Sequence, residues 1–165
     1  MRRIAALCVT LALCLSAATA QGGLSFVDAR GVTVSLPAKA VRVVSLSPEL
    51  TETLFAVGAG DAVVGVTTYC NYPAATASRQ KIGGFSAKTI RVETIVSLKP
   101  DLVLGGLSAH GQLATQFERA GLRFAAMDVT GIASVYESIA LLGRVAGDET
   151  KAAALTASLK ERVRA

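Results

Sequence analysis

Histidine, cysteine and tryptophan are scarce in this chain, and their scarcity excludes several kinds of chemistry. The 165 residues include one histidine, three cysteines and no tryptophan. Because the single histidine is His110, a zinc or manganese site built from several imidazoles is excluded. A serine hydrolase would need that histidine together with a nucleophile elbow, and residues 106–110, GLSAH, do not have the elbow pattern. We therefore expect neither a metal site nor an enzyme.

Two patterns typical of nucleotide binding are also absent. Basic residues are scattered from Arg30 to Arg164 without a run and without interleaved aromatic residues, so nucleic acid is not an expected partner. A dinucleotide-binding turn would need glycines directly after the first parallel strand, where the sequence has Ser47 and Pro48. The glycines at 58–60 follow a predicted helix instead, and no Walker lysine pattern occurs.

The first twenty residues have the pattern of a secretory leader. Arg2 and Arg3 form a basic start, residues 4–15 an apolar run, and residues 18–20, ATA, a small-residue cleavage site. The apolar run is too short to span a bilayer comfortably. We therefore predict a cleavable signal peptide over 1–20 and export to a bacterial periplasm.

Two of the three cysteines, Cys8 and Cys14, fall in this leader. Cys70 is then the only cysteine of the mature chain, so no internal disulfide is expected. A lipoprotein signal would have a small residue where Leu13 stands, which makes a lipid anchor on Cys14 the less favoured alternative. Cys70 has no basic neighbour to activate it, and we interpret it as a partly buried, unreactive thiol.

Strand-like and helix-like segments alternate through the rest of the chain. Residues 24–36 are typical of a hairpin with its turn at Gly31. The segments that follow are strands over 41–46, 62–66, 102–104 and 123–127, and helices over 48–57, 89–98, 110–120 and 132–146. This succession predicts an α/β fold: a Rossmann-like lobe over 21–147 with a parallel sheet flanked by helices.

Three helices carry more detailed expectations. Ser47 is a predicted cap for a helix that begins at Pro48, in which Thr53 belongs to the buried stripe. The helix over 89–98, capped by Thr89 or Ser86, is expected to bury an apolar stripe that includes Val96 and to leave Glu93 on the opposite, solvated face. A last helix starts at Asp148, repeats leucine or valine every fourth residue, and has no stop signal. We expect the chain to end inside this helix.

Ligands of parallel sheets bind outside the carboxyl ends of the strands. The candidate ligand contacts at those ends and in the adjacent glycine loop are Ser47, Pro48, Tyr69, Cys70, Phe85, Ser108 and His110. Tyr69 and Phe85 could pack on a large flat ligand or anchor their loops, and both interpretations stay open. Tyr72, beside Pro73, is interpreted as a loop anchor. For His110 a solvated residue at a helix start is favoured over one hydrogen bond or one axial metal ligand.

The combined motifs resemble the periplasmic binding proteins for cobalamin and iron-siderophore complexes, which feed ABC importers. The segments that carry the resemblance are RVVSLSP at 42–48, TE at 51–52, VGV at 64–66, YCNYP at 69–73, GGF at 83–85, VETIV at 92–96 and LKPDLV at 98–103. In that family two α/β lobes are joined by one long rigid helix, and the ligand lies between them. This chain resembles the first lobe, with residues 148–165 as a truncated interlobe helix.

The resemblance implies a function. The protein would be a monomer without a cofactor that captures a corrinoid or ferric-siderophore complex and delivers it to the permease subunits of an ABC importer. Glu93 would dock onto that permease, and Pro48, Tyr69 and Phe85 would contact the corrin. Phe85 cannot ligate iron, which disfavours haem, and the predicted loops have only Arg79 nearby, which favours cobalamin over an anionic siderophore. The alternative is a truncated or degenerate fragment without ligand affinity.

Overall fold

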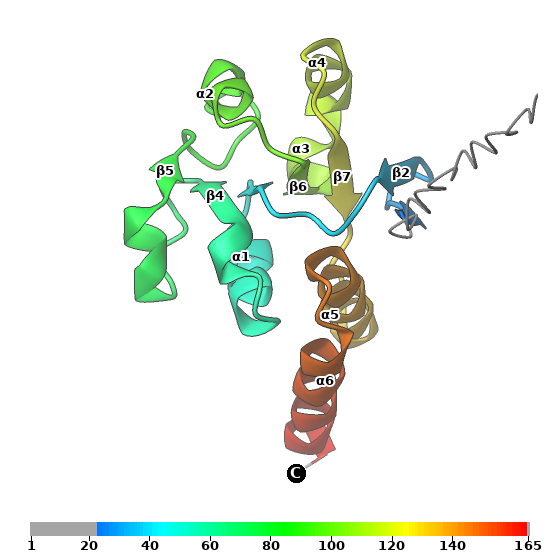
Figure 1. The fold of residues 1–165 in the computed structure, drawn as a ribbon. Helices are drawn as coiled ribbons and strands as arrows, with labels where there is room; N and C mark the ends of the chain where they lie inside the picture. Colours follow the sequence, from blue (N-terminus) through cyan, green and yellow to red (C-terminus); the bar gives the residue numbers. More distant parts are fainter. Residues whose placement is uncertain (1–22, 165) are drawn as a thin grey trace, which may run out of the picture.

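The structure is a computed structural model that describes residues 23–164 (Figure 1). The predicted signal peptide and Cys14 lie outside the described residues. The strands are β1 Leu24–Val27, β2 Thr33–Leu36, β3 Val43–Ser45, β4 Val63–Val66, β5 Gln80–Lys81, β6 Leu102–Gly106 and β7 Phe124–Met127. The α-helices are α1 Pro48–Ala56, α2 Val92–Ser97, α3 Leu107–His110, α4 Ala114–Arg119, α5 Ile132–Ala146 and α6 Glu149–Arg164. Short 3-10 helices are Gly60–Ala62, Ala74–Ser78 and Gly111–Leu113.

The central sheet is parallel throughout and has the strand order β5-β4-β3-β6-β7. The chain moves outward from β3 through β4 to β5 and then returns to β6 on the other side of β3. The direction of winding therefore reverses between β3 and β6. Such a switch point opens a crevice at the carboxyl ends of the strands, where ligands of open α/β sheets bind. The predicted α/β lobe is confirmed.

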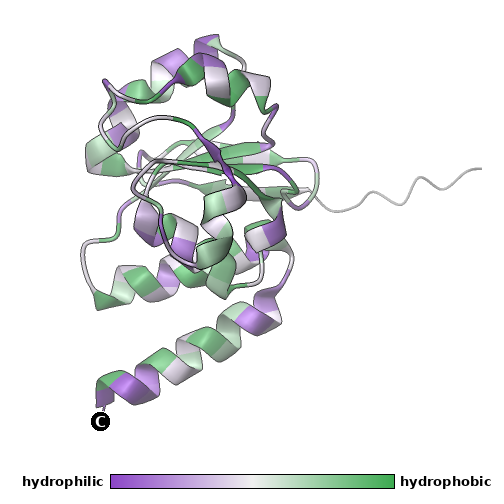
Figure 2. Cartoon of the chain, turned by 90° about the vertical axis from the view of Figure 1, so that its left-hand side faces the viewer, coloured by the Kyte–Doolittle hydropathy of each residue, from purple (hydrophilic) through white to green (hydrophobic). Residues whose placement is uncertain are grey.

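Successive side chains on the central strands point into two separate hydrophobic cores. On β3, Val43 lies in one core and Val44 in the other, and on β6 Leu104 and Val103 divide in the same way. Helices α1 and α5 cover the first core, while α2 and α4 cover the second (Figure 1). Figure 2 shows the mostly hydrophobic strands between these two layers. Each fully buried aliphatic side chain contributes about 1.5–3 kcal/mol to folding, so both layers are firmly attached.

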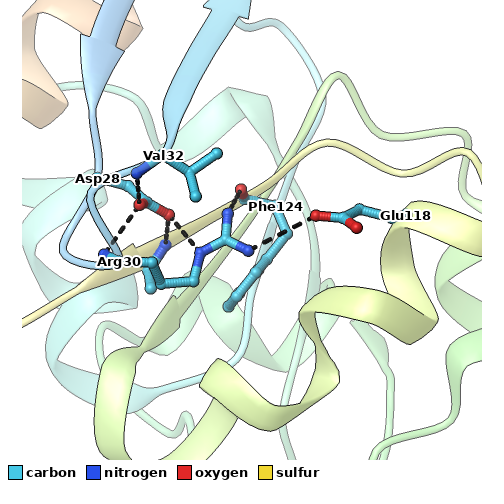
Figure 3. A network of polar contacts seen from close by, with 6 residues as sticks. Asp28, Arg30, Val32, Glu118 and Phe124 are labelled. Atoms are coloured by element: carbon cyan, nitrogen blue, oxygen red, sulfur yellow. Dashed lines mark hydrogen bonds and ion pairs between the residues drawn. The ribbon is translucent and has the colours of Figure 1, made fainter.

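A buried carboxylate and the backbone bond from the N–H of Ala29 to the carbonyl of Ala126, at 2.9 Å, link the N-terminal hairpin, β1 and β2, to the edge strand β7 (Figure 3). Asp28 accepts backbone N–H bonds from Arg30, Val32 and Ala126 at 2.9, 3.1 and 3.0 Å, and the Nε of Arg30 at 2.7 Å. The Arg30 guanidinium also bonds the carbonyl of Phe124 at 2.9 Å and lies over its ring. Gly31 occupies the predicted turn with a φ of 76°.

Helix α1 differs from its prediction in two details. Pro48 is the first helical residue, as expected, but the hydroxyl of Ser47 makes no capping bond and is buried without a partner. Thr51, not Thr53, faces the core: it is fully buried, and its hydroxyl lies 2.8 Å from that of Ser45 under the helix. The predicted cap therefore holds for the backbone position of Ser47 only.

Helix α2 is shorter than predicted and begins at Val92. Residues 86–89 form a turn instead, and Ile90 makes a bridge with Gly83 that takes the backbone of the expected first helical turn. The stripe prediction is wrong for Val96, which is 41% exposed, while Ile95 is buried.

The helix predicted over 110–120 begins earlier in the structure. The chain enters α3 directly after Gly106 and continues through a 3-10 helix, Gly111–Leu113, into α4. His110 is thus the last residue of α3 and is fully buried, so its interpretation as a solvated residue at a helix start is wrong.

Helix α6 extends from the body of the lobe (Figure 2). The N–H of Lys151 bonds the carboxylate of Asp148 at 3.0 Å, which confirms the helix start at Asp148. Leu155 and Leu159 pack against the first core, but Val163 is 60% exposed. Across residues 23–164, none of the helices combines the length and the apolar character that a bilayer crossing requires.

Candidate ligand-binding site

A cavity of about 500 Å³ opens beside the carboxyl ends of β3, β4 and β5. It is lined by Pro48, Tyr69, Gly84, Phe85, Ser86 and Thr89. The first residue begins α1 after β3, the second follows β4, and the others belong to the loop after β5. The structure therefore brings together three of the predicted ligand contacts, Pro48, Tyr69 and Phe85.

The aromatic side chains at this cavity are exposed. Tyr69 is 63% and Phe85 39% accessible to solvent, although aromatic rings of this size are among the strongest contributors to a core when buried. Their exposure favours contact with a ligand over loop anchoring. The anchor interpretation of Tyr72 is wrong, because its side chain is 65% exposed and does not line the cavity.

The loop that carries Phe85 is closed by a tight turn. The N–H of Thr89 bonds the carbonyl of Ser86 at 2.8 Å, and their hydroxyls lie 3.0 Å apart. Gly84 donates its N–H to the carbonyl of Thr89 at 3.2 Å, and Gly83 has a φ of 114°. A side chain on Gly83 would meet the Thr89 carbonyl oxygen at 2.1 Å, so glycine is required there. The turn presents the Phe85 ring toward the cavity.

His110 lies beneath this loop. Its Nδ1 accepts the N–H of Gly106 at 3.0 Å, and its Nε2 lies 2.7 Å from the carbonyl oxygen of Phe85. The two rings meet edge to face, with their centroids 5.1 Å apart. Burial lowers the pKa of His110, while the Phe85 carbonyl and the carboxylate of Glu49 act in the opposite direction. Both ring nitrogens are engaged, so the imidazole contacts the loop and does not offer a lone pair to the cavity.

Cys70 supports the loop that carries Tyr69, as His110 supports the loop that carries Phe85. Its sulfur is buried and lies 3.2 Å from the hydroxyls of both Thr51 and Thr67, and its carbonyl accepts the ammonium of Lys81 at 3.1 Å. These contacts join α1, the end of β4 and β5. The interpretation of Cys70 as a partly buried thiol understates its burial: the residue is almost completely buried and supports its loop from below the cavity.

Not all predicted ligand contacts reach the cavity. Ser47, Cys70 and His110 are buried behind it, and Ser108 is exposed on α3 but does not line it. Ser86 and Thr89 line the cavity and were not expected as contacts. Their spacing after the glycine pair resembles a helix cap in the sequence, and the turn that they form instead depends on the distant bridge to Gly83.

Outside the cavity, Glu93 is exposed in the first turn of α2, as predicted.

A larger hollow of about 680 Å³ lies between the hairpin, β7 and α5, and holds none of the predicted contacts. Its buried carboxylate, Asp28, is already occupied by backbone donors. Within residues 23–164, histidine, cysteine and carboxylate side chains form no group of three that could hold a metal ion.

Comparisons with known proteins agree with this architecture. Residues 43–165 match the sequence pattern of the family described as periplasmic binding protein. An uncharacterised ABC transporter substrate-binding lipoprotein of Bacillus subtilis is 37% identical over 137 residues, which cover 81% of this chain and 43% of the relative. A cobalamin-binding protein of Halobacterium salinarum is 34% identical over 139 residues, covering 84% of this chain and 38% of the relative.

Among solved structures, the apo form of a periplasmic heme-binding protein from Roseiflexus superposes with a TM-score of 0.66 and 28% identity, over 74% of this chain and 47% of that one. This chain thus spans less than half the length of these relatives. The family consists of non-enzymatic transport components, in agreement with the expectation that the chain is not an enzyme. On its sequence pattern, its sheet order and its relatives, the chain belongs to the periplasmic binding protein family.

Proposed function

We propose that this chain forms one wall of a periplasmic binding site for a corrinoid or an iron-chelate complex, which it delivers to an ABC importer. The observation that carries the proposal is the cavity at the carboxyl ends of the strands, in which Pro48, Tyr69 and Phe85 converge. Rigid aromatic and proline surfaces suit a large flat ligand and lose little side-chain entropy on binding. Export would follow from the leader over 1–20.

The charges around the cavity favour cobalamin over an anionic siderophore. The lining residues carry no ionisable group except the phenol of Tyr69. A ferric siderophore with anionic groups would be matched by arginine side chains. Arg79, the arginine expected near the loops, instead donates to the carbonyl of Gly60 at 3.1 Å and lies over the ring of Phe55. The proposed ligand is therefore a corrinoid.

Haem is the second candidate, and Tyr69 is the reason for keeping it. A tyrosinate oxygen can ligate haem iron, and Tyr69 presents an exposed phenol at the cavity. Phe85 on the facing loop has no ligating atom. Haem binding through Tyr69 alone would leave the second axial position of the iron to a group outside this cavity.

The transport partners belong to the same proposal. Glu93, exposed on α2, is the proposed contact with the permease subunits of the importer. The chain would act as a monomer, without a cofactor of its own. Since the cavity forms one wall of a cleft, a second wall would have to cover the far face of the ligand, because ligand sites of this kind bury most of the ligand surface.

Titration of the chain with cyanocobalamin and with hemin, followed by absorbance and calorimetry, tests the proposal. Tyr69→Ala and Phe85→Ala should each weaken cyanocobalamin binding about tenfold, the effect of ~1.4 kcal/mol of lost contact. Tyr72→Ala is the matched control, because it removes an equally exposed ring outside the cavity. Absence of binding at high micromolar ligand would instead indicate a truncated or degenerate fragment without affinity.

The variants also separate the two ligands. Tyr69→Phe should leave cyanocobalamin affinity nearly unchanged, because the ring surface is kept. The same change should abolish any tyrosinate charge-transfer band of bound hemin, because the ligating oxygen is lost. Equal effects of Tyr69→Ala and Tyr72→Ala on cyanocobalamin would show that the ligand lies elsewhere on the aromatic surface.

A further inference from the structure

His110 is the only histidine of the chain and is completely buried. It is the last residue of α3 and takes no part in a metal group. Its ring joins two segments that lie far apart in the sequence: the end of β6 at Gly106 and the loop at Phe85. The ring also supports the Phe85 side chain edge to face. A buried imidazole that links the end of β6 to one wall of the cavity has a specific structural task.

We propose that His110 is a positioning residue that fixes the Phe85 wall of the ligand cavity, and that it does so only as the neutral imidazole protonated on Nε2. The part that concerns ligand affinity rests on the proposed function. The part that concerns the position of the loop does not.

The hydrogen bonds define the tautomer. A backbone N–H can only donate, so the Nδ1 that faces Gly106 at 3.0 Å must carry a lone pair. The hydrogen of the neutral ring is then on Nε2, which donates to the carbonyl oxygen of Phe85 at 2.7 Å. The ring thus accepts from one segment and donates to the other.

The backbone at the end of β6 packs closely against His110. A side chain on Gly105 would approach the Cβ of His110 to 2.9 Å, so the strand end is shaped around this residue. A leucine at 110 could fill a similar space, but it could neither accept the N–H of Gly106 nor donate to the carbonyl of Phe85. A buried polar group left without its partner is destabilising. The Phe85 loop would therefore be held less firmly.

Protonation has a defined consequence at this site. A second hydrogen on Nδ1 would point at the N–H of Gly106 and set two donors against each other. The charged group that acts on the ring from a neighbouring element is Glu49 on α1; β6 and the Phe85 loop contribute their backbone N–H and carbonyl groups. Acid should therefore release the Gly106 contact and loosen the Phe85 wall.

The absence of tryptophan from the chain provides a reporter. Phe85→Trp places a single fluorophore on the wall and keeps the carbonyl that His110 binds. Acrylamide quenching of this tryptophan is measured without ligand from about pH 8 to about pH 5, the range in which histidine titrates. With His110 present, quenching should increase as the pH falls below 6.5, the ordinary histidine value.

Replacement of His110 in the reporter chain separates positioning from packing. His110→Gln can still place an amide N–H near the Phe85 carbonyl, so quenching should stay low and lose its pH dependence. His110→Leu should give high quenching at every pH. Ser108→Ala, on the exposed side of the same short helix, is the control and should match the parent. A pH profile that persists in His110→Gln, or low quenching in folded His110→Leu, would overturn the proposal.

Cyanocobalamin titration of the chain with native Phe85 supplies the second readout. His110→Leu should weaken binding about tenfold, and His110→Gln should restore most of the affinity. If quenching responds as expected but no variant binds cyanocobalamin, the proposed function fails and the positioning role stands. If cyanocobalamin binds equally to all variants and quenching is constant, the positioning role fails and the proposed function stands.

Discussion

Asp28 and His110 both tie a peripheral segment to the sheet, but they use different kinds of hydrogen bond. Asp28 is an ionised carboxylate that gathers three backbone N–H groups and a guanidinium, and it fastens the hairpin to β7. His110 is a neutral ring with one bond on each side, and it fastens the Phe85 loop to β6. Charge-assisted bonds are roughly twice as strong as neutral ones. The hairpin is therefore held more firmly than the cavity wall.

The same contrast governs their response to acid. Burial by itself would raise the pKa of Asp28, but the N–H of Ala126, the guanidinium of Arg30 and the N–H of Val32 outweigh it and lower the pKa below 3.8. For His110 burial itself lowers the pKa below 6.5. In both cases folding favours the unprotonated form. The site loop thus becomes sensitive at a higher pH than the hairpin does.

Asp28→Ala should have the largest effect on stability. The substitution leaves the Arg30 guanidinium and several backbone donors without their acceptor, so the free energy of unfolding in urea should fall by about 3 kcal/mol. Asp61→Ala is the matched control, because Asp61 pairs with Arg79 at 3.8 Å while its carboxylate is fully exposed, and it should change little. Equal stability of the two variants would show that the buried network does not hold the hairpin.

Alanine at Gly83 should destabilise the protein more than alanine at Gly31, because the turn of the cavity wall has no space for a side chain and the turn of the hairpin has. Gly83→Ala forces a methyl group against the Thr89 carbonyl at a φ of 114° and should cost about 2 kcal/mol or more. At Gly31 the φ is 76° and the space is open, so Gly31→Ala should cost only about 1 kcal/mol. Urea unfolding measures both costs.

Cavity binding separates the two glycine variants further. Cyanocobalamin affinity should fall for Gly83→Ala, because the Phe85 loop has to move, and should be unchanged for Gly31→Ala. Similar losses of stability in both variants would mean that the loop after β5 relaxes around a methyl group and that its turn is not required for the wall.

The free energy of unfolding, measured against pH, should fall in two separate steps as the pH is lowered. Each step should be smaller than the effects of the substitutions above. The contribution of His110 is complete above its unfolded value of about 6.5 and is lost as the pH falls below that value toward its lowered folded pKa. The contribution of Asp28 is complete above about 3.8 and is lost as the pH falls further. His110→Gln should remove only the first loss and Asp28→Asn only the second. A single acid loss that survives both substitutions would contradict the comparison.

Sequence periodicity predicted the parallel lobe because most of its strands are short apolar segments, valine-rich in β3 and β4, that are separated by clear helix stops. The helix from Ile132 to Ala146 and the turn at Gly31 have the predicted positions, since their signals are local. The convergence of Pro48, Tyr69 and Phe85 was predictable from the rule that strand ends form the site together with a family resemblance.

The supports of the site were not predictable, because they depend on contacts between distant segments. His110 looks like a helix start in the sequence, and it is the pairing with a residue 25 positions away that buries it. Residues 86–89 look like a helix cap, but the bridge between Gly83 and Ile90 turns them into a loop. Val96 has an apolar side chain at a core spacing, yet Val92 and Ile95 form the buried face of α2 and Val96 stays exposed.

Substitution of Glu93 should have the smallest effect on stability, because the side chain is exposed and fastens no segment to the sheet. Glu93→Lys should therefore leave urea unfolding and cyanocobalamin affinity unchanged, while its reversed charge weakens association with importer permease about tenfold at low salt. Glu161→Lys, an equal change of charge on exposed α6, is the control for net charge and should keep permease association. Surface plasmon resonance on permease in nanodiscs measures both. If Glu93→Lys reduced ligand affinity, α2 would belong to the ligand wall, and the division between cavity and docking face would be in the wrong place.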